Sequence, residues 1–352
     1  MQLTYRRLAL QLAHPWTIAR TLGKVPREKQ QTAHVVVAEL TDGHGVCGLG
    51  EAAPSPRYGE SVESVAAFLG RVDAARLSFD DVDGSWRYLE GLGPGEAAAR
   101  CALDIALHDG AARRAGRPLY DHLGLGFREG HHVTSFSIGL DAPEVIRRKV
   151  GLAAAFPILK VKLGSPKDRE IMAAVREVAP TKRVRVDANE AWKTREEALR
   201  HLEWLAADGQ VEFVEQPMPA GTARADLAWL KARAPLPLMA DESCLTPEAA
   251  AQCAEGFHAV NVKLVKTAGV RGALATLRAA RRAGLRTMLG CMVETSILIS
   301  AAAHLAELTD YLDLDGNLLI TNDPYCGVAA ERGVLSFVGA AERSGLRVGR
   351  RV

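Results

Sequence analysis

Ile158-Leu-Lys-Val-Lys-Leu163 sets the pattern that decides the fold: an apolar run that ends in charged side chains. Four similar runs follow at intervals of about 25 residues, the length of one strand, one helix and their connecting loops. The five runs end at Lys162, Asp187, Glu215, Asp241 and Lys263. Chemically active side chains at the C-terminal ends of successive βα units are typical of the active face of a TIM barrel. The pattern therefore predicts such a barrel with its active site at the mouth.

Eight strands are expected in this part of the chain, which favours a closed (β/α)8 barrel of the α/β class over an open doubly wound sheet. Five of them end at the charged residues named above. The first is Val133–Ile138, and the last two are Arg286–Gly290 and Asp310–Asp315. We therefore predict a catalytic barrel domain over residues 126–321.

Residues 1–125 do not follow this rhythm. Strand-like runs at Leu3–Leu12 and Ala33–Leu40 come first, and the Ala-rich stretch Gly95–Gly116 has apolar positions at helical spacing. Strands followed by helices predict an α+β domain that caps the barrel. The C-terminal segment, residues 322–352, is expected to return to this capping domain.

Composition narrows the function class. The chain of 352 residues is 48% hydrophobic and carries 44 basic and 42 acidic residues, a net charge of +2 that gives no sign of a nucleic-acid-binding surface. Six cysteines lack any zinc-binding spacing, no apolar run approaches a membrane span, and no signal-type segment opens the chain. These features predict a soluble, cytoplasmic protein without a membrane or nucleic-acid partner.

The three carboxylates predict a metal centre. Strands four apart face each other across a barrel mouth, so Lys162 and Lys263 are expected on opposite sides of Asp187, Glu215 and Asp241. Taken singly, each acid is more often an N-cap or an ion-pair partner. Three that converge would repel each other unless a cation joined them, and ligation by oxygen alone favours Mg²⁺.

Lys160 and Lys162 are two apart on a strand and point to the same face. Charging both ammonium groups is costly, which is expected to lower the pKa of one of them toward neutrality and to create a general base. An isolated pair of this kind is more simply read as neutralising the carboxylates. Lys263, expected on the opposite side of the carboxylates, favours the general-base interpretation. Bases on both faces of a carbon acid can remove a proton from one side and return it from the other.

These residues resemble motifs of the enolase superfamily, in its muconate-lactonizing subgroup, over nearly the whole chain. Lys160-Val-Lys162 looks like the family's KxK motif. The metal-ligand motifs are similar to Val186-Asp-Ala-Asn189, Glu215-Gln-Pro217 and Ala240-Asp-Glu-Ser243, and the second-base motif to Asn261-Val-Lys263 with Lys266-Thr-Ala-Gly269. The family usually has Gly-Gly where this chain has Ala268-Gly269, a departure that we expect to alter only loop packing.

The resemblance implies a modified, enolase-like barrel and a role for each residue of the motifs. Asp187, Glu215 and Asp241 would bind Mg²⁺, which holds a substrate carboxylate. Lys162 and Lys263 would exchange the α-proton, and Lys160 would help to stabilise the enolate. The groups expected to orient the metal ligands and the bases from behind are Asn189, Glu242 and Lys266.

The last strand indicates the substrate. Asp313 and Asp315 both point into the mouth and would bind a cation at the end opposite the metal. A dipeptide zwitterion fits this arrangement, and the Asp-x-Asp pattern resembles the signature of dipeptide epimerases. Gly290-Cys-Met-Val-Glu-Thr-Ser296 is similar to that family's seventh-strand motif, and its Glu294 is expected near Lys263 among the substrate-binding groups. Spacing alone leaves open that the two aspartates cap the loop before Gly316.

The polar segment Thr17–Gln31 matches the position of the loop that covers such sites. It offers Arg20, Lys24, Arg27 and Lys29, which suit an acidic C-terminal residue, although solvated surface charges explain them equally well. L-Ala-D/L-Glu from cell-wall peptide is the default substrate that the resemblance implies, and we expect a homo-oligomer.

Two alternatives remain open. The same scaffold serves N-acylamino-acid racemases, o-succinylbenzoate synthases and muconate-type cycloisomerases, whose substrates lack a free ammonium and would leave Asp313 and Asp315 without a partner. A catalytically silent binding protein is the other alternative, and the intact set of lysines and carboxylates argues against it.

Overall fold

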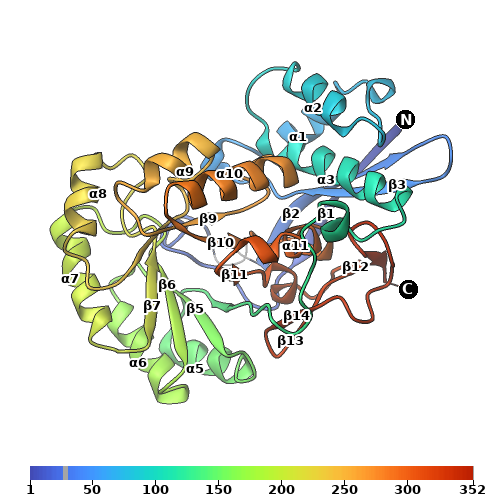
Figure 1. The fold of residues 1–352 in the computed structure, drawn as a ribbon. Coiled ribbons are helices and arrows are strands. Elements are labelled where there is room, and N and C mark those ends of the chain that lie inside the picture. Colours follow the sequence, from blue (N-terminus) through green and yellow to red (C-terminus); the bar gives the residue numbers. More distant parts are fainter. Residues whose placement is uncertain (27–30, 352) are drawn as a thin grey trace.

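A parallel eight-stranded barrel forms the centre of the molecule (Figure 1). The computed structural model describes residues 1–26 and 31–351. Each strand pairs in parallel with the next along the chain. The strands are β4 (Phe136–Ile138), β5 (Ile158–Lys162), β6 (Arg183–Asp187), β7 (Val211–Glu215), β8 (Leu238–Ala240), β9 (Ala259–Val262), β10 (Arg286–Gly290) and β11 (Tyr311–Asp313). The barrel closes through a parallel bridge between Thr134 and Leu312.

Helices cover the outside of the barrel between successive strands. They are α5 (Pro143–Leu152), α6 (Asp168–Val178), α7 (Arg195–Ala206), α8 (Arg224–Lys231), α9 (Pro247–Cys253), α10 (Val270–Arg282) and α11 (Ser296–Ala303). After β11 comes only the short 3-10 helix η5 (Gly316–Leu319), so within the described residues the eighth α-helix of a regular TIM barrel is missing. The barrel is thus of the modified kind that the sequence predicted.

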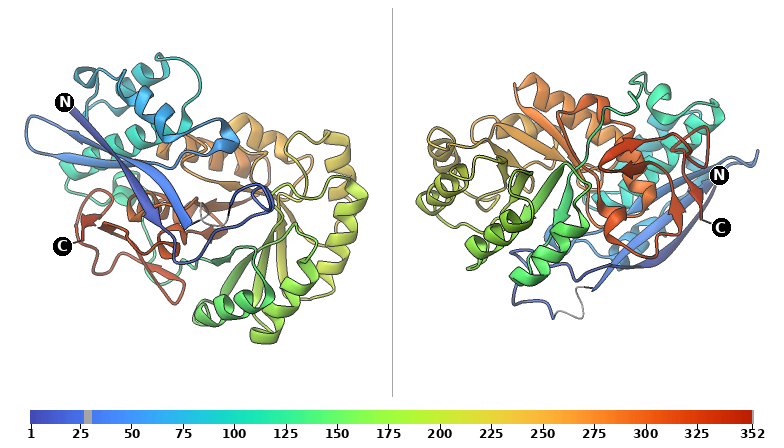
Figure 2. Two further views of the ribbon diagram at one scale, coloured as in Figure 1. Left: turned by 180° about the vertical axis from the view of Figure 1, so that it is seen from behind. Right: turned by 90° about the horizontal axis from the view of Figure 1, so that it is seen from below.

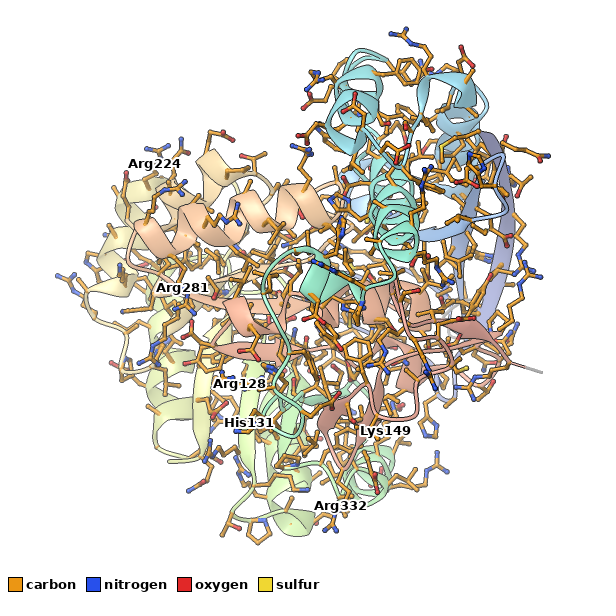
Figure 3. All side chains as sticks on the ribbon, turned by 45° about the vertical axis from the view of Figure 1, so that its right-hand side comes forward. Arg128, His131, Lys149, Arg224, Arg281 and Arg332 are labelled. Carbon is orange, nitrogen blue, oxygen red and sulfur yellow. The ribbon has the colours of Figure 1, made fainter. Side chains whose placement is uncertain are left out.

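Charged side chains on the outer face of these helices form surface ion pairs. Arg224 on α8 lies 3.5 Å from Glu255, and Arg281 on α10 lies 3.0 Å from Asp310 (Figure 3). Exposed ion pairs of this kind add little to the stability of the fold. No helix among the described residues is long and apolar enough to cross a bilayer.

The capping domain joins an antiparallel sheet to four helices. The sheet contains β1 (Gln2–Gln11), β2 (Thr32–Thr41) and β3 (Cys47–Ala52), and the helices are α1 (Val62–Leu69), α2 (Val82–Glu90), α3 (Ala97–Arg114) and α4 (Leu119–His122). Strand β3 was not expected from its glycine-rich sequence. A Cβ at Gly48 or Gly50 would lie 2.0 Å or 1.8 Å from a carbonyl oxygen of α3, so these glycines permit the close packing of helix on strand.

Residues of the C-terminal segment contact the capping-domain sheet near the N-terminus (Figure 2). The segment forms two small antiparallel ladders, β12 (Tyr325–Cys326) with β15 (Gly349–Arg350) and β13 (Ala329–Glu331) with β14 (Val334–Ser336). Arg6 on β1 donates a hydrogen bond of 2.6 Å to the Tyr325 hydroxyl, and Arg350 lies 2.7 Å from Glu39 on β2. These contacts join the two ends of the chain.

Two buried carboxylates of the capping domain dock it onto barrel helices. Asp104 on α3 accepts a hydrogen bond of 3.1 Å from the Arg271 amide at the start of α10. Glu51 on β3 accepts from the Thr295 and Leu298 amides at the start of α11, at 2.9 and 3.3 Å. The first amides of a helix lack partners within the helix, and carboxylates satisfy them. The capping domain is therefore fixed over the barrel mouth.

Candidate active site

A cavity of about 320 Å³ lies between the barrel mouth and the capping domain. Its barrel wall includes Lys160, Lys162, Lys263, Asp313 and Asp315. Its other wall comes from the N-terminal chain, with Trp16, Ile18, Arg20, His34 and the segment 53–56. The predicted lysines and the two aspartates at the end of β11 therefore line one cavity.

Asp187, Glu215 and Asp241 form a buried triad beneath this cavity. One oxygen from each lies within 4.8 Å of the others, and all three side chains are shielded from solvent. Asp187 and Glu215 end adjacent strands in matched register, and Asp241 directly follows the next strand. An oxygen-only donor set of three carboxylates fits a hard divalent cation.

The electrostatics of the triad reflect this crowding. Burial and the neighbouring Asp187 raise the pKa of Glu215 to about 7. Burial opposes ionisation of Asp187 as well, but Lys162 and Lys160 outweigh it and bring the pKa of Asp187 to about 2. Burial likewise disfavours ionised Asp241, yet Lys263 and Lys266 hold its pKa well below the usual range. The site gathers negative charge that surrounding cations stabilise.

The lysines contact the triad from two sides. Lys162 Nζ on β5 lies 2.5 Å from Asp187, and Lys263 Nζ, just after β9, lies 2.9 Å from Asp241. Strands β5 and β9 are four apart in the barrel order. The two ammonium groups therefore approach the mouth from opposite sides, as the sequence predicted.

One electrostatic expectation is not met at Lys160. The lysine pair was expected to depress the pKa of one of its members, but the pKa of Lys160 lies well above its usual value. Burial disfavours the Lys160 ammonium, and the carboxylates of Asp313, Glu215 and Asp187 overcome that cost. The pKa of Lys263 is raised in the same way by Asp241. These acids come from other strands, which the KxK spacing does not reveal.

Further residues of the motifs support the triad from behind. The backbone N–H of Asn189 donates a hydrogen bond of 2.9 Å to Asp187, and Lys266 lies 2.6 Å from the Asp241 carboxylate. Two contacts were not foreseen: Asn261 donates to Glu215 at 2.8 Å, and the Gln216 side chain accepts from the Asp241 amide at 2.9 Å. Both residues belong to the sequence motifs that contain the metal-ligand and second-base positions, so their place in those motifs could have indicated that they contact the triad.

A charged network joins the N-terminal loop to the barrel. Arg20 forms an ion pair with Glu242 and a weaker one of 3.3 Å with Glu190. Arg57 donates two hydrogen bonds of 2.8 Å to Glu190. Glu242 is thus placed one residue after a triad member and against the loop. Arg57 and Glu190 were not singled out from the sequence, because neither belongs to a spaced pattern.

Asp313 and Asp315, at the end of β11, both line the cavity. Asp313 lies 2.7 Å from Lys160 and accepts a hydrogen bond of 2.7 Å from the Ser135 hydroxyl. Asp315 accepts one of 2.6 Å from the Ser137 amide of β4. Burial and the neighbouring Asp313 raise the pKa of Asp315 to about 7. The Asp315 side chain does not cap η5, so the loop-capping alternative does not account for it.

Lys24 and Glu294, two further predicted substrate-binding groups, do not line the cavity. Lys24 is exposed and does not line the cavity. Arg27 and Lys29 fall outside the described residues. Glu294 is buried below the cavity wall, where it accepts a hydrogen bond of 2.8 Å from the Met292 amide. Burial and the nearby Glu51 raise the pKa of Glu294 to about 8.

Comparison with known proteins assigns the family. Residues 9–124 match the mandelate racemase/muconate lactonizing enzyme N-terminal domain, and residues 144–319 match the enolase C-terminal domain-like family. The chain therefore belongs to the mandelate racemase/muconate lactonizing enzyme family of the enolase superfamily.

Relatives within the family share most of the chain. A protein of Pedosphaera parvula named L-Ala-D/L-amino acid epimerase is 56% identical over 99% of this chain and 99% of its own. The substrate-liganded L-Ala-D/L-Glu epimerase of Bacillus subtilis is 27% identical with a TM-score of 0.90, covering 100% of this chain and 99% of that one. A dipeptide epimerase of Enterococcus faecalis, complexed with Mg and L-Leu-L-Tyr, is 29% identical with a TM-score of 0.87 and covers 99% of both chains.

Proposed function

We propose that this protein is a dipeptide epimerase, an isomerase that inverts the α-carbon of the C-terminal residue of a dipeptide by removing and returning a proton. One observation carries the proposal. Lys162 and Lys263 line one cavity, and each contacts a different member of a buried carboxylate triad. A base on each side of a bound carbon acid is what inversion requires. The names of the relatives agree with this chemistry.

Mg²⁺ is the proposed cofactor, held by Asp187, Glu215 and Asp241. Three converging carboxylate oxygens suit it. Two buried polar oxygens near the triad, Asn189 Oδ1 and Glu242 Oε2, have no hydrogen-bond partner among the described residues. The bound ion would supply positive charge for the substrate carboxylate and for the charge that develops when the α-proton leaves.

The lysines then divide the proton transfers. Lys162 Nζ removes the α-proton of one stereoisomer, and Lys263 Nζ donates a proton to the opposite face of the same carbon; the reverse reaction exchanges these roles. Lys160, fixed between Asp313 and Glu215, keeps its charge and stabilises the enolate oxygen from below. A cation held by the triad would weaken the hold of Asp241 on the Lys263 proton, and Lys263 would then be able to act as a base.

The substrate ammonium is proposed to bind at Asp313 and Asp315, at the end of β11. Lys160 already engages Asp313, so Asp315 is the carboxylate left to accept from a new cation. A free dipeptide supplies that cation. An N-acylamino acid, a succinylbenzoate precursor or a muconate does not, which disfavours the alternative activities of this scaffold.

L-Ala-D/L-Glu remains the proposed substrate. Arg20 lines the cavity and could release Glu190, its weaker partner, to meet an acidic side chain, whereas Lys24 lies outside the cavity wall. A homo-oligomeric, cytoplasmic enzyme of cell-wall peptide metabolism is the corresponding physiological proposal.

Free and N-acetylated dipeptides compared in deuterium oxide test this function. Wild-type protein should exchange and epimerise L-Ala-L-Glu, and N-acetylation should lower the rate about tenfold to a hundredfold through loss of a charge-assisted contact. Asp315→Asn should narrow that gap by slowing the free dipeptide. A preference for N-acyl amino acids would favour the racemase or synthase activity instead, and no exchange on any substrate would favour a binding protein.

A further inference from the structure

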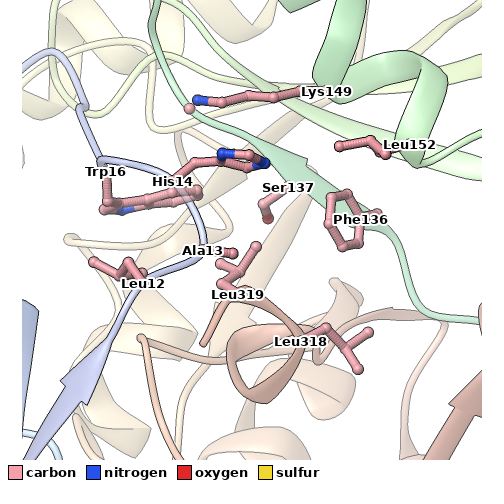
Figure 4. A pocket seen from close by; sticks show the side chains of 11 residues that line it. Leu12, Ala13, His14, Trp16, Phe136, Ser137, Lys149, Leu152, Leu318 and Leu319 are labelled. Atoms are coloured by element: carbon pink, nitrogen blue, oxygen red, sulfur yellow. The ribbon is translucent and has the colours of Figure 1, made fainter. Parts of the chain in front are cut away.

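A second cavity adjoins the active site on the side of the two aspartates. It has a volume of about 210 Å³, and we call it the apolar chamber (Figure 4). Its walls include Leu12, His14, Trp16, Phe136, Leu318 and Leu319. Phe136 is held by Phe156, with ring centroids 4.8 Å apart. The chamber is thus built from fixed, mainly apolar side chains.

The apolar chamber and the active-site cavity share three wall residues, Trp16, Ser137 and Leu319. Lys162 Nζ lies 6.0 Å from the centre of the Trp16 ring, so this ring separates the proposed base from the chamber. The backbone N–H of Ser137 donates a hydrogen bond of 2.6 Å to the Asp315 carboxylate. The chamber therefore adjoins the active site at its ammonium-binding end and not at the metal end.

Charge in the chamber is low. Lys149 at its rim lies 3.3 Å from Asp141, which neutralises it. Burial and the nearby Lys149 lower the pKa of His14, so the imidazole is neutral at physiological pH. With no unbalanced charge on the wall, a polar or charged side chain would lose its hydration here, whereas an aliphatic one would gain from burial.

The order of the chemical groups along a dipeptide determines which of its two side chains would lie next to the apolar chamber. In the proposed binding mode, the C-terminal carboxylate lies at the triad, the reacting α-carbon between the two lysines, and the ammonium at Asp315. The side chain of the N-terminal residue branches from the carbon that carries this ammonium, and so it starts beside Ser137. The side chain of the C-terminal residue branches from the reacting carbon instead, near Ile18 and Arg20.

We propose that the apolar chamber is a subsite for the N-terminal side chain, which extends the substrates from L-Ala dipeptides to those that begin with leucine or methionine. This inference rests on the proposed epimerase function. It identifies Leu318 as a residue that determines specificity, because Leu318 lines the chamber and not the active-site cavity.

Paired substitutions at Leu318 test the subsite. L-Ala-L-Ala and L-Leu-L-Ala share a C-terminal residue, so they report on the N-terminal side chain alone. Wild-type protein should epimerise both with kcat/KM values within about tenfold of each other. Leu318→Trp, which fills the chamber, should raise KM for L-Leu-L-Ala about tenfold and leave L-Ala-L-Ala unchanged. Leu318→Ala, which enlarges it, should instead extend activity to L-Phe-L-Ala.

The outcomes separate this inference from the function on which it rests. Activity on L-Ala-L-Ala shows that each variant is folded. L-Ala-L-Ala turnover with no L-Leu-L-Ala turnover in wild type would overturn the subsite and leave the epimerase standing. Equal losses on both substrates in Leu318→Trp would also overturn it. Absence of exchange with every dipeptide would contradict the proposed function itself.

Discussion

Lys160 Nζ lies 2.7 Å from Asp313 Oδ2, a contact that spans β4 at the seam where the barrel closes. The same ammonium lies 2.8 Å from Glu215. A single buried lysine thus joins the carboxylate triad to the acidic pair. The two ends of the proposed dipeptide site share one electrostatic network.

Lys160→Met should remove that link. Activity should fall about 10²- to 10³-fold, and the free energy of unfolding about 3–5 kcal/mol, because two buried carboxylates lose their cation. Urea unfolding and kcat measure the two effects. In the double variant with Asp313→Asn, stability should recover in part while activity should not. Full activity in Lys160→Met would contradict this role.

Removal of divalent cations should abolish turnover. Exhaustive chelation leaves three buried carboxylates without their proposed ion, and Mg²⁺ should restore the rate. Binding should also raise the unfolding temperature as Mg²⁺ is added, because the ion binds the folded state alone. Asp241→Asn should weaken both responses. A chelated protein that still turns over at full rate would exclude the metal.

Stability should fall as the pH rises through the titration of Glu294. Its pKa of about 8 in the folded protein exceeds the usual value of 4.5. Between these values the folded state keeps a proton that the unfolded state has lost, so the free energy of unfolding decreases with pH. Glu294→Gln should reduce that decrease by about 2–4 kcal/mol between pH 5 and 8. Glu144→Gln, at an exposed site, is the control and should follow wild type.

Ala268 was expected to affect only loop packing, but its backbone is left-handed, with φ of 59°. Such a conformation strains alanine and not glycine. Ala268→Gly should therefore raise the free energy of unfolding by about 1 kcal/mol. Ala232→Gly, at a position with φ of −68°, should lower it. Chemical denaturation of the two variants should give opposite signs, and equal signs would refute the strain.

The barrel could be predicted from the sequence because each strand is marked by a local pattern, an apolar run that ends in a charged residue. Strands β5, β6 and β7 end at the residues expected, Lys162, Asp187 and Glu215, since each apolar run stops where the chain leaves the core. Asp241 and Lys263 lie one residue beyond their strands. The convergence of the three carboxylates of Asp187, Glu215 and Asp241 followed from this spacing.

Residues that act through tertiary contacts could not be predicted. Ser135 and Ser137 meet the acidic pair only because the barrel closes between β4 and β11. Arg57 and Glu190 come from different domains and share no spacing. Strand β3 lacks a β-rich composition because its glycines accommodate α3. Each depends on elements distant in sequence.

Deuterium exchange with Lys162→Ala and Lys263→Ala tests the two-base account most directly. L-Ala-L-Glu and L-Ala-D-Glu are incubated separately with each variant in deuterium oxide, and the α-position is followed by proton NMR. Both variants should lose epimerisation, and each should retain exchange of only one stereoisomer, a different one in each variant. Epimerisation near the wild-type rate in either variant would contradict the account.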